Sequence, residues 1–367
     1  MISKLIYEYF KLNTLSGYNK CEFKANQIIS NEALVRDTLS NLSFKNEWYK
    51  KLNKKIKYYH FKFSITSIDE FSNLYRVHVT HSRIFCFNNS LRTYHKSKNE
   101  NFIFIIIKEK NKYLIKEVAY KEDNPKFYNS LLSSDLESIY SSRTFGDLLW
   151  TKRLNDIDIL YSGYINLNKS LSNNDLFKFK ANATNDLDKS IANTTPSSKI
   201  IGKATLETQK YTYRLANNSN STLINCDDLI KYARKYALNY NKNYTQFSNS
   251  GGDCTNFVSQ ALNFAGLPKS NIWKPYTASW IMVIPLRDYL IKNDIAIEYD
   301  VLCPRPVGTI IQFFSPIKER FSHTGIITDM LNNGELLYCC HDYDKLDFPL
   351  SETYPIFYKR IRNLQIK

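Results

Sequence analysis

The sequence predicts an α+β protein built from two folded parts. Residues 1–160 begin with helical patterns and end with strand patterns. Residues 161–222 are rich in Asn, Ser, Thr and Lys, hold few apolar residues and lack periodicity, which is typical of a polar linker. Residues 223–367 then regain a globular composition. Helices followed by a meander of strands are expected to give a curved antiparallel sheet wrapped on a helix.

The N-terminal part carries the clearest strand patterns. Before them, apolar residues recur at roughly helical spacing at Leu34, Leu39, Leu42, Phe44 and Trp48. Apolar, β-branched and aromatic residues then dominate four stretches, at 56–68, 74–87, 101–110 and 112–123. This order, together with the ending "YLIKEVAYKED", resembles the NTF2-like (SnoaL-like) fold. The resemblance implies an NTF2-like α+β domain over residues 1–160.

The chain is basic, and its excess charge is unevenly distributed. It holds 50 Lys and Arg against 35 Asp and Glu, a net charge of +15. Residues 225–367 carry 16 basic against 14 acidic residues, so most of the excess lies in residues 1–224. Such a surface can bind nucleic acid or an anionic polymer of a wall or membrane. Because basic residues never run for more than three positions, an ordinary solvated surface is the preferred interpretation, and no specific nucleic-acid partner is expected.

The cysteines and the N-terminus favour a reduced, intracellular protein. The seven cysteines are odd in number and scattered, unlike a disulfide framework. The first 20 residues interrupt their apolar cluster with Lys4, Glu8 and Lys11, unlike a signal peptide. The apolar run "FIFIII" at 102–107 has strand length, so no transmembrane segment is expected. We expect a cytoplasmic protein, with lytic or non-classical release left open and the oligomeric state undetermined.

The stretch "NSGGDCTNFVSQALNFAGLP" (249–268) places Cys254 where it can react. Apolar residues recur with helical period after the cysteine, and a Gly and a Pro end the pattern. Cys254 is therefore expected in the first turn of a buried helix, where unpaired backbone N–H groups and the helix dipole favour the thiolate. The two preceding glycines leave an open approach to the sulfur, and Asp253 is a candidate helix cap. The alternative is an inert, buried cysteine.

Histidines follow on strand patterns downstream. Strands are predicted for "GTIIQFF" (308–314), for "SHTGIITDM" (322–330), which begins with His323, and for "ELLYCCHDYDKLD" (335–347), which carries His341. A cysteine at a helix start, with histidines on strands packed against that helix, is the geometry that a Cys-His pair requires.

Four segments of the C-terminal part resemble a known family. The runs "GGDCTNFVSQAL", "SWIMVIPLRDYL", "SHTGIIT" and "YCCHDYD" are similar in order and spacing to the Amidase_6 family of bacterial amidase domains, which is related to the NlpC/P60 and CHAP papain-like cysteine hydrolases. The resemblance covers about 225–367. It implies a papain-like (NlpC/P60-type) domain with a catalytic helix packed on an antiparallel sheet, Cys254 as nucleophile, and His323 as general base and then acid.

The resemblance also implies residues that support this pair. His341 would orient His323, with Asp342 as the rival for that role, and the backbone N–H of Cys254 would form part of an oxyanion hole. One departure is that the family's usual Gly-Asp before the histidine strand is Gly308-Thr309 here, which removes a structural carboxylate.

Further residues are expected around the site. Asp253, Asn256 and Tyr244 would line it beside Asp342. An insertion that many family members carry is shortened here to "LPKSNIWKPYTA", so the substrate groove is expected to differ from the usual one. Trp273 and Trp280 are expected either as an aromatic wall of the substrate cleft or as core residues.

These features predict a cysteine amidase or peptidase that acts on a peptide or a peptidoglycan-like cell-wall peptide. Cys254 attacks the carbonyl, His323 protonates the leaving amine, and water resolves the thioester. The alternatives are an acyltransferase of the same fold, and a non-catalytic protein whose basic N-terminal domain binds an anionic polymer. No cofactor or metal is expected, because Cys339 and Cys340 point to opposite faces of a strand and lack a second pair at metal-binding spacing.

Overall fold

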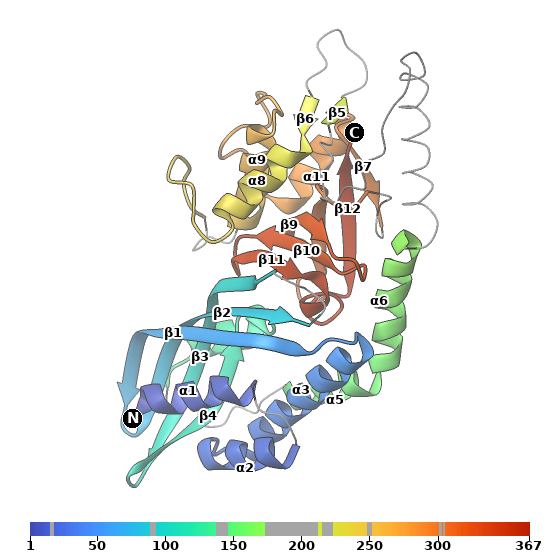
Figure 1. Cartoon of the computed structure of the whole chain (residues 1–367). Coiled ribbons are helices and arrows are strands. Elements are labelled where there is room, and N and C mark those ends of the chain that lie inside the picture. The colour runs from blue at the N-terminus through green and yellow to red at the C-terminus, as the bar shows by residue number, and fades with distance from the viewer. Residues whose placement is uncertain are drawn as a thin grey trace, which may run out of the picture.

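The predicted α+β class is confirmed by the computed structural model of the chain, in which helices cover an open antiparallel sheet (Figure 1). The structure describes residues 1–14, 18–88, 93–136, 146–172, 212–214, 223–247, 252–300, 303 and 305–367. None of the helices in these ranges combines the length and the apolar character that a membrane span requires.

The N-terminal half consists of three helices followed by a meander of strands. The helices are α1 (Ile2–Leu12), α2 (Tyr18–Ile28) and α3 (Glu32–Lys51). The strands are β1 (Ile56–Phe71), β2 (Leu74–Phe87), β3 (His95–Glu109) and β4 (Lys112–Tyr120). Each strand pairs antiparallel with the next one along the chain. The side chain of Asn31 accepts a hydrogen bond from the N–H of Ala33 at 2.9 Å and so fixes the start of α3.

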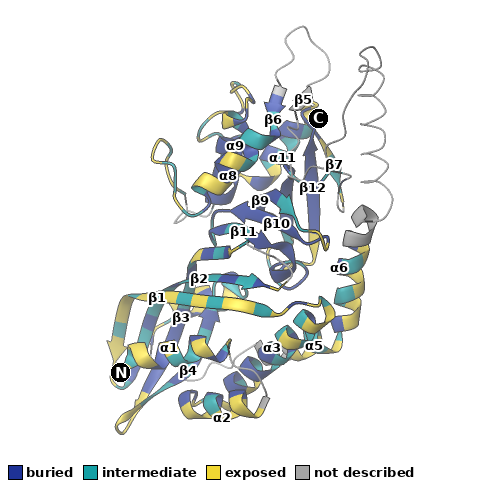
Figure 2. Ribbon diagram, viewed as in Figure 1, coloured by how far each residue is buried: buried dark blue, intermediate teal, exposed yellow. Residues whose placement is uncertain are grey.

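Helices cover both faces of this meander. α1, α2 and α3 bury Phe10, Ala25 and Leu39 against Val77 and Phe104 of the sheet. The opposite face is covered by α4 (Pro125–Ser133), and α5 (Gly146–Asn155) and α6 (Ile157–Ser172) follow along the chain. The edge strand β1 alternates between exposed and half-buried residues, whereas the strands inside the sheet are largely buried (Figure 2).

The C-terminal half packs its helices on one face of a second group of strands. Its helices are α8 (Cys226–Tyr236), α9 (Asp253–Phe264), α10 (Ala278–Ile281) and α11 (Val283–Lys292). Its strands are β7 (Ala296–Tyr299), β8 (Ile310–Ser315), β9 (Arg320–Met330), β10 (Leu336–Cys340), β11 (Lys345–Pro349) and β12 (Arg360–Ile366), and a separate pair is formed by β5 (Thr212–Arg214) and β6 (Leu223–Asn225). Cys339 packs under the helices and Cys340 packs on the opposite face, as strand alternation requires.

The two halves share one sheet. The strand order is β1-β2-β3-β11-β10-β9-β8-β12-β7, with β4 paired to β3 outside this path. The junction is the antiparallel pair β3–β11, in which Ser97 lies opposite Lys345, and Figure 1 shows the N-terminal meander continuing into the C-terminal strands. Phe85 of β2 stacks edge-on against Phe348 of β11, with ring centroids 5.5 Å apart. The N-terminal half is therefore packed directly against the C-terminal sheet.

Buried polar bonds reinforce this junction. The amino group of Lys54 forms an ion pair with Glu335 at 2.6 Å, and Lys345 forms one with Glu122 at 2.5 Å. All four side chains are at least 97% buried. Breaking one partner of such a buried pair typically costs about 3–5 kcal/mol, so these contacts hold the two halves in a fixed relation.

Most predicted elements are present, with shifted ends. The strands expected at 101–110 and 112–123 are observed as β3 and β4, and the strand expected over 335–347 is interrupted by a turn between β10 and β11. α6 crosses the expected boundary at residue 160. Most of the expected linker, residues 173–211 and 215–222, lies outside the described residues.

Candidate active site

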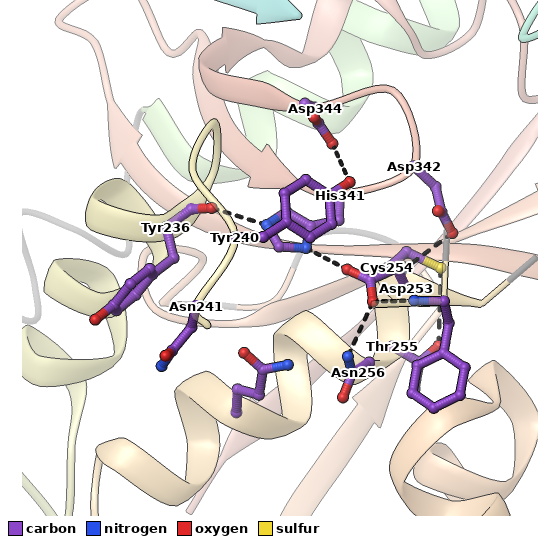
Figure 3. A network of polar contacts seen from close by, with 12 residues as sticks. Tyr236, Tyr240, Asn241, Asp253, Cys254, Thr255, Asn256, His341, Asp342 and Asp344 are labelled. Carbon is purple, nitrogen blue, oxygen red and sulfur yellow. Dashed lines mark hydrogen bonds and ion pairs between the residues drawn. The ribbon is translucent and has the colours of Figure 1, made fainter. Parts of the chain in front are cut away.

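Cys254 lies in the first turn of α9, where the sequence predicts it. The helix begins at Asp253, and the preceding N-cap residue is Gly252, which has no side chain to cap the backbone. The backbone N–H of Cys254 instead donates to Oδ2 of Asp342 at 3.2 Å (Figure 3). Cys254 is 3% exposed. A carboxylate from a distant turn therefore occupies the backbone donor that the sequence assigns to an oxyanion hole.

His323 lies on β9, the strand against which α9 packs. It is 3% exposed, and its Nε2 atom has no hydrogen-bond partner within the described part of the chain. Aromatic rings hold the imidazole: the ring of Tyr358 is nearly parallel to it at 6.0 Å, and the rings of Phe313 and Tyr343 lie at 5.5 and 5.6 Å. The imidazole is thus positioned by packing.

Cys254 and His323 open into the same cavity of about 780 Å³. This volume suits a ligand of several residues, since ligand pockets usually measure ~300–1,000 Å³. No hydrogen bond joins the sulfur to the imidazole among the described residues. The backbone of Thr324, directly after His323, hydrogen-bonds the sulfur and favours its thiolate form. Residues of the N-terminal half, including Asn99 and Glu122, also line the cavity.

The protonation states differ from the activated thiolate that the sequence predicts. Burial, aided by the charge of Asp342, raises the pKa of the Cys254 thiol well above its usual range, although hydrogen bonds from Thr255 and Thr324 act to lower it. Burial, together with the charges of Lys345 and Lys318, lowers the pKa of His323 to about 3. Burial also raises the pKa of Asp342 to about 6. At neutral pH the pair is therefore a neutral thiol and a neutral imidazole, with Asp342 ionised.

His341 does not orient His323, contrary to the expectation. Its Nδ1 contacts Oδ2 of Asp253 at 2.5 Å, and its Nε2 contacts the carbonyl oxygen of Tyr236 at 2.8 Å (Figure 3). Burial acts to lower the pKa of His341, but the hydrogen bond to Asp253 and the nearby acidic charges raise it overall. Its ring stacks on those of Tyr240 and Phe257 at 4.0 and 4.2 Å. His341 therefore ties the start of α9, through Asp253, to the end of α8, through Tyr236.

Asp253 and Asn256 support the helix from inside the protein. Asp253 does not cap α9; its carboxylate accepts hydrogen bonds from the backbone N–H of Phe247 and from Nδ2 of Asn256, both at 2.9 Å. The amide of Asn256 also donates to the carbonyl oxygen of Thr245 at 3.0 Å. Both side chains are almost fully buried, and neither lines the cavity.

The aromatic residues expected in the cleft belong elsewhere. Trp273 and Trp280 are fully buried, with ring centroids 4.7 Å apart, and they form core beneath α9. The indole N–H of Trp280 donates to Oδ1 of Asn256 at 2.9 Å. Tyr244 stacks on Trp280 and borders a second cavity of about 540 Å³, away from Cys254. Of the expected lining residues, Asp342 alone borders the cavity together with Cys254 and His323.

A turn separates β10 from β11, where the sequence predicts one strand over 335–347. Asp344 accepts a hydrogen bond from Tyr240 at 2.8 Å (Figure 3) and another from Asn99 of β3 at 2.5 Å. Asp342 and Tyr343 have positive φ values of 59° and 130°, conformations that are uncommon for residues with side chains. The polar run "HDYDK" after a buried strand signals such a turn. The described residues contain no cluster of His, Cys, Asp or Glu side chains that could hold a metal ion.

Comparison with known proteins supports the sequence resemblance. Residues 224–362 match the model of the family described as "Putative amidase domain". A curated relative, "Uncharacterized protein YjcM" from Bacillus subtilis (strain 168), is 49% identical over 130 residues, which are 33% of this chain and 31% of that protein. No solved structure matches. The predicted resemblance to this family is thereby confirmed for residues 224–362, and the likenesses to NlpC/P60 and NTF2-like proteins stay predictions.

Proposed function

We propose that the amidase domain at residues 224–362 is a cysteine hydrolase that cleaves an amide bond in a peptide, with Cys254 as nucleophile and His323 as general base and acid. The observation that carries this proposal is that both side chains open into one cavity, from the first turn of α9 and from the adjacent strand β9. Helix-borne cysteine beside strand-borne histidine is the arrangement of a papain-like domain, and this finer fold assignment is part of the proposal.

The protonation states indicate how the reaction would begin. Because the thiol of Cys254 and the imidazole of His323 are both neutral at pH 7, the thiol proton transfers to the imidazole as the sulfur attacks the carbonyl carbon. The imidazolium then protonates the leaving amine, which departs and leaves a thioester on Cys254. Water activated by His323 cleaves the thioester and releases the acid.

The oxyanion donor needs a rearrangement in this mechanism. The backbone N–H of Cys254 can stabilise the tetrahedral intermediate only when Asp342 no longer accepts its hydrogen bond. His323 would act without a third catalytic side chain, since His341 is committed to Asp253 and the imidazole is held by aromatic rings. His341 and Asp253 are positioning residues that fix the first turn of α9.

Cleavage of a mixed peptide library, read as new termini by mass spectrometry, tests the proposal. Wild-type protein should generate products, and Cys254→Ala and His323→Ala should each lose at least about 10³-fold in rate, as expected for members of a nucleophile–base pair. Cys340→Ala is the matched control because Cys340 is equally buried but faces the opposite core. Products that persist in Cys254→Ala, or their absence in the wild type, would contradict the proposal. New amide products formed with an added amine would identify acyl transfer instead.

A further inference from the structure

The cavity that contains Cys254 also holds a set of charged side chains whose acidic members are all bonded within the protein. Glu122 pairs with Lys345 at 2.5 Å, and Asp123 pairs with Arg153 at 3.6 Å. The two other acidic residues bind the backbone N–H of Cys254 and the side chains of Asn99 and Tyr240; they are Asp342 and Asp344. The negative charges of the cavity are therefore already engaged.

Three exposed basic side chains of the same cavity lack an acidic partner within the described part of the chain, while the half-buried Lys121 also lines the cavity and lies over the ring of Tyr128 at 5.9 Å. Lys318, Arg320 and Lys359 line the cavity, are exposed, and form no ion pair with any described residue. The strand register brings them together: Arg320 lies opposite Ser315, and Lys359 directly precedes β12, whose first residue pairs with the end of β8. They therefore share one rim of the sheet.

This rim is close to the proposed general base. Arg320 precedes His323 by three residues on β9, and the charge of Lys318 is near enough to lower the pKa of the imidazole. An anionic group seated against the rim would thus bind beside β9, the strand that carries His323, in the cavity that contains Cys254. Such a group would also offset the repulsion between these three like charges.

We propose that the substrate is an acidic peptide, with a carboxylate close to the scissile amide that binds Lys318, Arg320 and Lys359. This inference rests on the proposed function, because it defines the substrate class of the same site. The carboxylate has two possible sources in a peptide, an acidic side chain or the C-terminus. Because the rim is exposed, its contribution is expected to weaken as salt rises.

Three near-isosteric probes distinguish these sources: N-acetylglutamate α-amide, N-acetylglutamine and the uncharged N-acetylglutamine amide. Their binding is measured by calorimetry on Cys254→Ala, which cannot turn them over. A unit charge at roughly 8 Å in water changes affinity about two- to threefold, so three charges predict an advantage of about 10-fold for the probe with the correctly placed carboxylate. Raising the salt concentration should reduce this advantage.

Variants locate the effect. In the Cys254→Ala background, the triple change Lys318→Gln, Arg320→Gln and Lys359→Gln should remove the preference, whereas Lys292→Gln, an exposed lysine on α11 outside the cavity, should keep it. Equal or undetectable binding of all three probes, or a preference that survives the triple change, overturns the inference. Neither result affects Cys254-dependent cleavage in the peptide library, so failure of the inference and failure of the proposed function are separable.

A covalent readout in the protein with its native cysteine gives a second test. Iodoacetate is anionic and iodoacetamide is neutral, and the two reagents differ mainly in this charge. The iodoacetate rate divided by the iodoacetamide rate at Cys254 therefore reports the electrostatic potential near the sulfur. The triple change should lower this ratio about 5- to 10-fold and leave the iodoacetamide rate nearly unchanged. An unchanged ratio would contradict the inference.

Discussion

Replacement of Asp342 by Asn should activate the thiol of Cys254. The side-chain oxygen of Asn can still accept the hydrogen bond from the backbone N–H of Cys254, so the change removes a charge and keeps the contact. In the wild type, Asp342 has a pKa of about 6 and is ionised between pH 7 and 9. Its negative charge disfavours the thiolate, so removing it must lower the pKa of the thiol.

The size of the effect follows from the geometry. Oδ2 of Asp342 lies 3.2 Å from the nitrogen of Cys254. With the sulfur at a separation of about 5 Å and an effective dielectric constant of ~20, Coulomb's law gives about 3 kcal/mol, or roughly 2 pKa units as an upper bound. We expect a shift of about 1–2 units. Because a less basic thiolate is also less nucleophilic, alkylation at pH 7 should accelerate about 3- to 12-fold.

The assay is the rate of iodoacetamide labelling at Cys254 between pH 6 and 10, read by peptide mass spectrometry. Asp344→Asn is the matched control. It removes a carboxylate from the same turn, but this carboxylate accepts hydrogen bonds from Tyr240 and Asn99 instead of from Cys254. A labelling rate at pH 7 that stays the same or falls in Asp342→Asn, or an equal gain in rate in Asp344→Asn, would refute the reasoning.

Three further changes test the packing around the site, each by chemical denaturation. His341→Gln should lower the free energy of unfolding by about 3–5 kcal/mol near pH 5–6. Because the pKa of His341 is raised in the folded protein, this loss of stability should shrink as the pH rises above that pKa. A loss that grows with pH would contradict the account. Glu122→Gln should lower the free energy of unfolding by a similar amount, because it leaves Lys345 buried without its partner. Adding Lys345→Met should restore most of the lost stability. No recovery in the double variant would argue against a coupled pair. Gly308→Ala should destabilise by more than about 2 kcal/mol, since the residue has φ +83° and an added Cβ would lie 1.9 Å from Sγ of Cys226; unchanged stability would exclude this clash.

Local pattern was sufficient to predict the elements that carry the nucleophile and the base. Cys254 falls where an apolar helical period begins, and His323 falls on a strand whose neighbours are apolar. Both positions follow from periodicity within a dozen residues, and so the structure agrees with them. The helix start is one residue earlier than expected, because Gly252 serves as N-cap.

Contacts between distant segments were beyond that pattern. The carboxylate that binds the N–H of Cys254 belongs to Asp342, and the carboxylate that binds His341 belongs to Asp253. The two residues of each pair lie 88 positions apart in the chain, and no spacing rule relates them. Trp280 was open between cleft and core because a tryptophan suits both; the structure buries it since its N–H finds Asn256. The helix dipole suggested a stabilised thiolate, but burial dominates the pKa of Cys254.

The central claim is that Cys254 becomes acylated by an amide substrate. The most direct measurement mixes the protein rapidly with a peptide p-nitroanilide, made from a peptide that the library experiment shows to be cleaved, and records the intact-protein mass. Tandem mass spectrometry then locates the adduct. The account predicts a mass increase equal to the acyl group, located on Cys254, labile to hydroxylamine as a thioester is, and absent from Cys254→Ala. Release of p-nitroaniline without an adduct, and at an unchanged rate in Cys254→Ala, would contradict it.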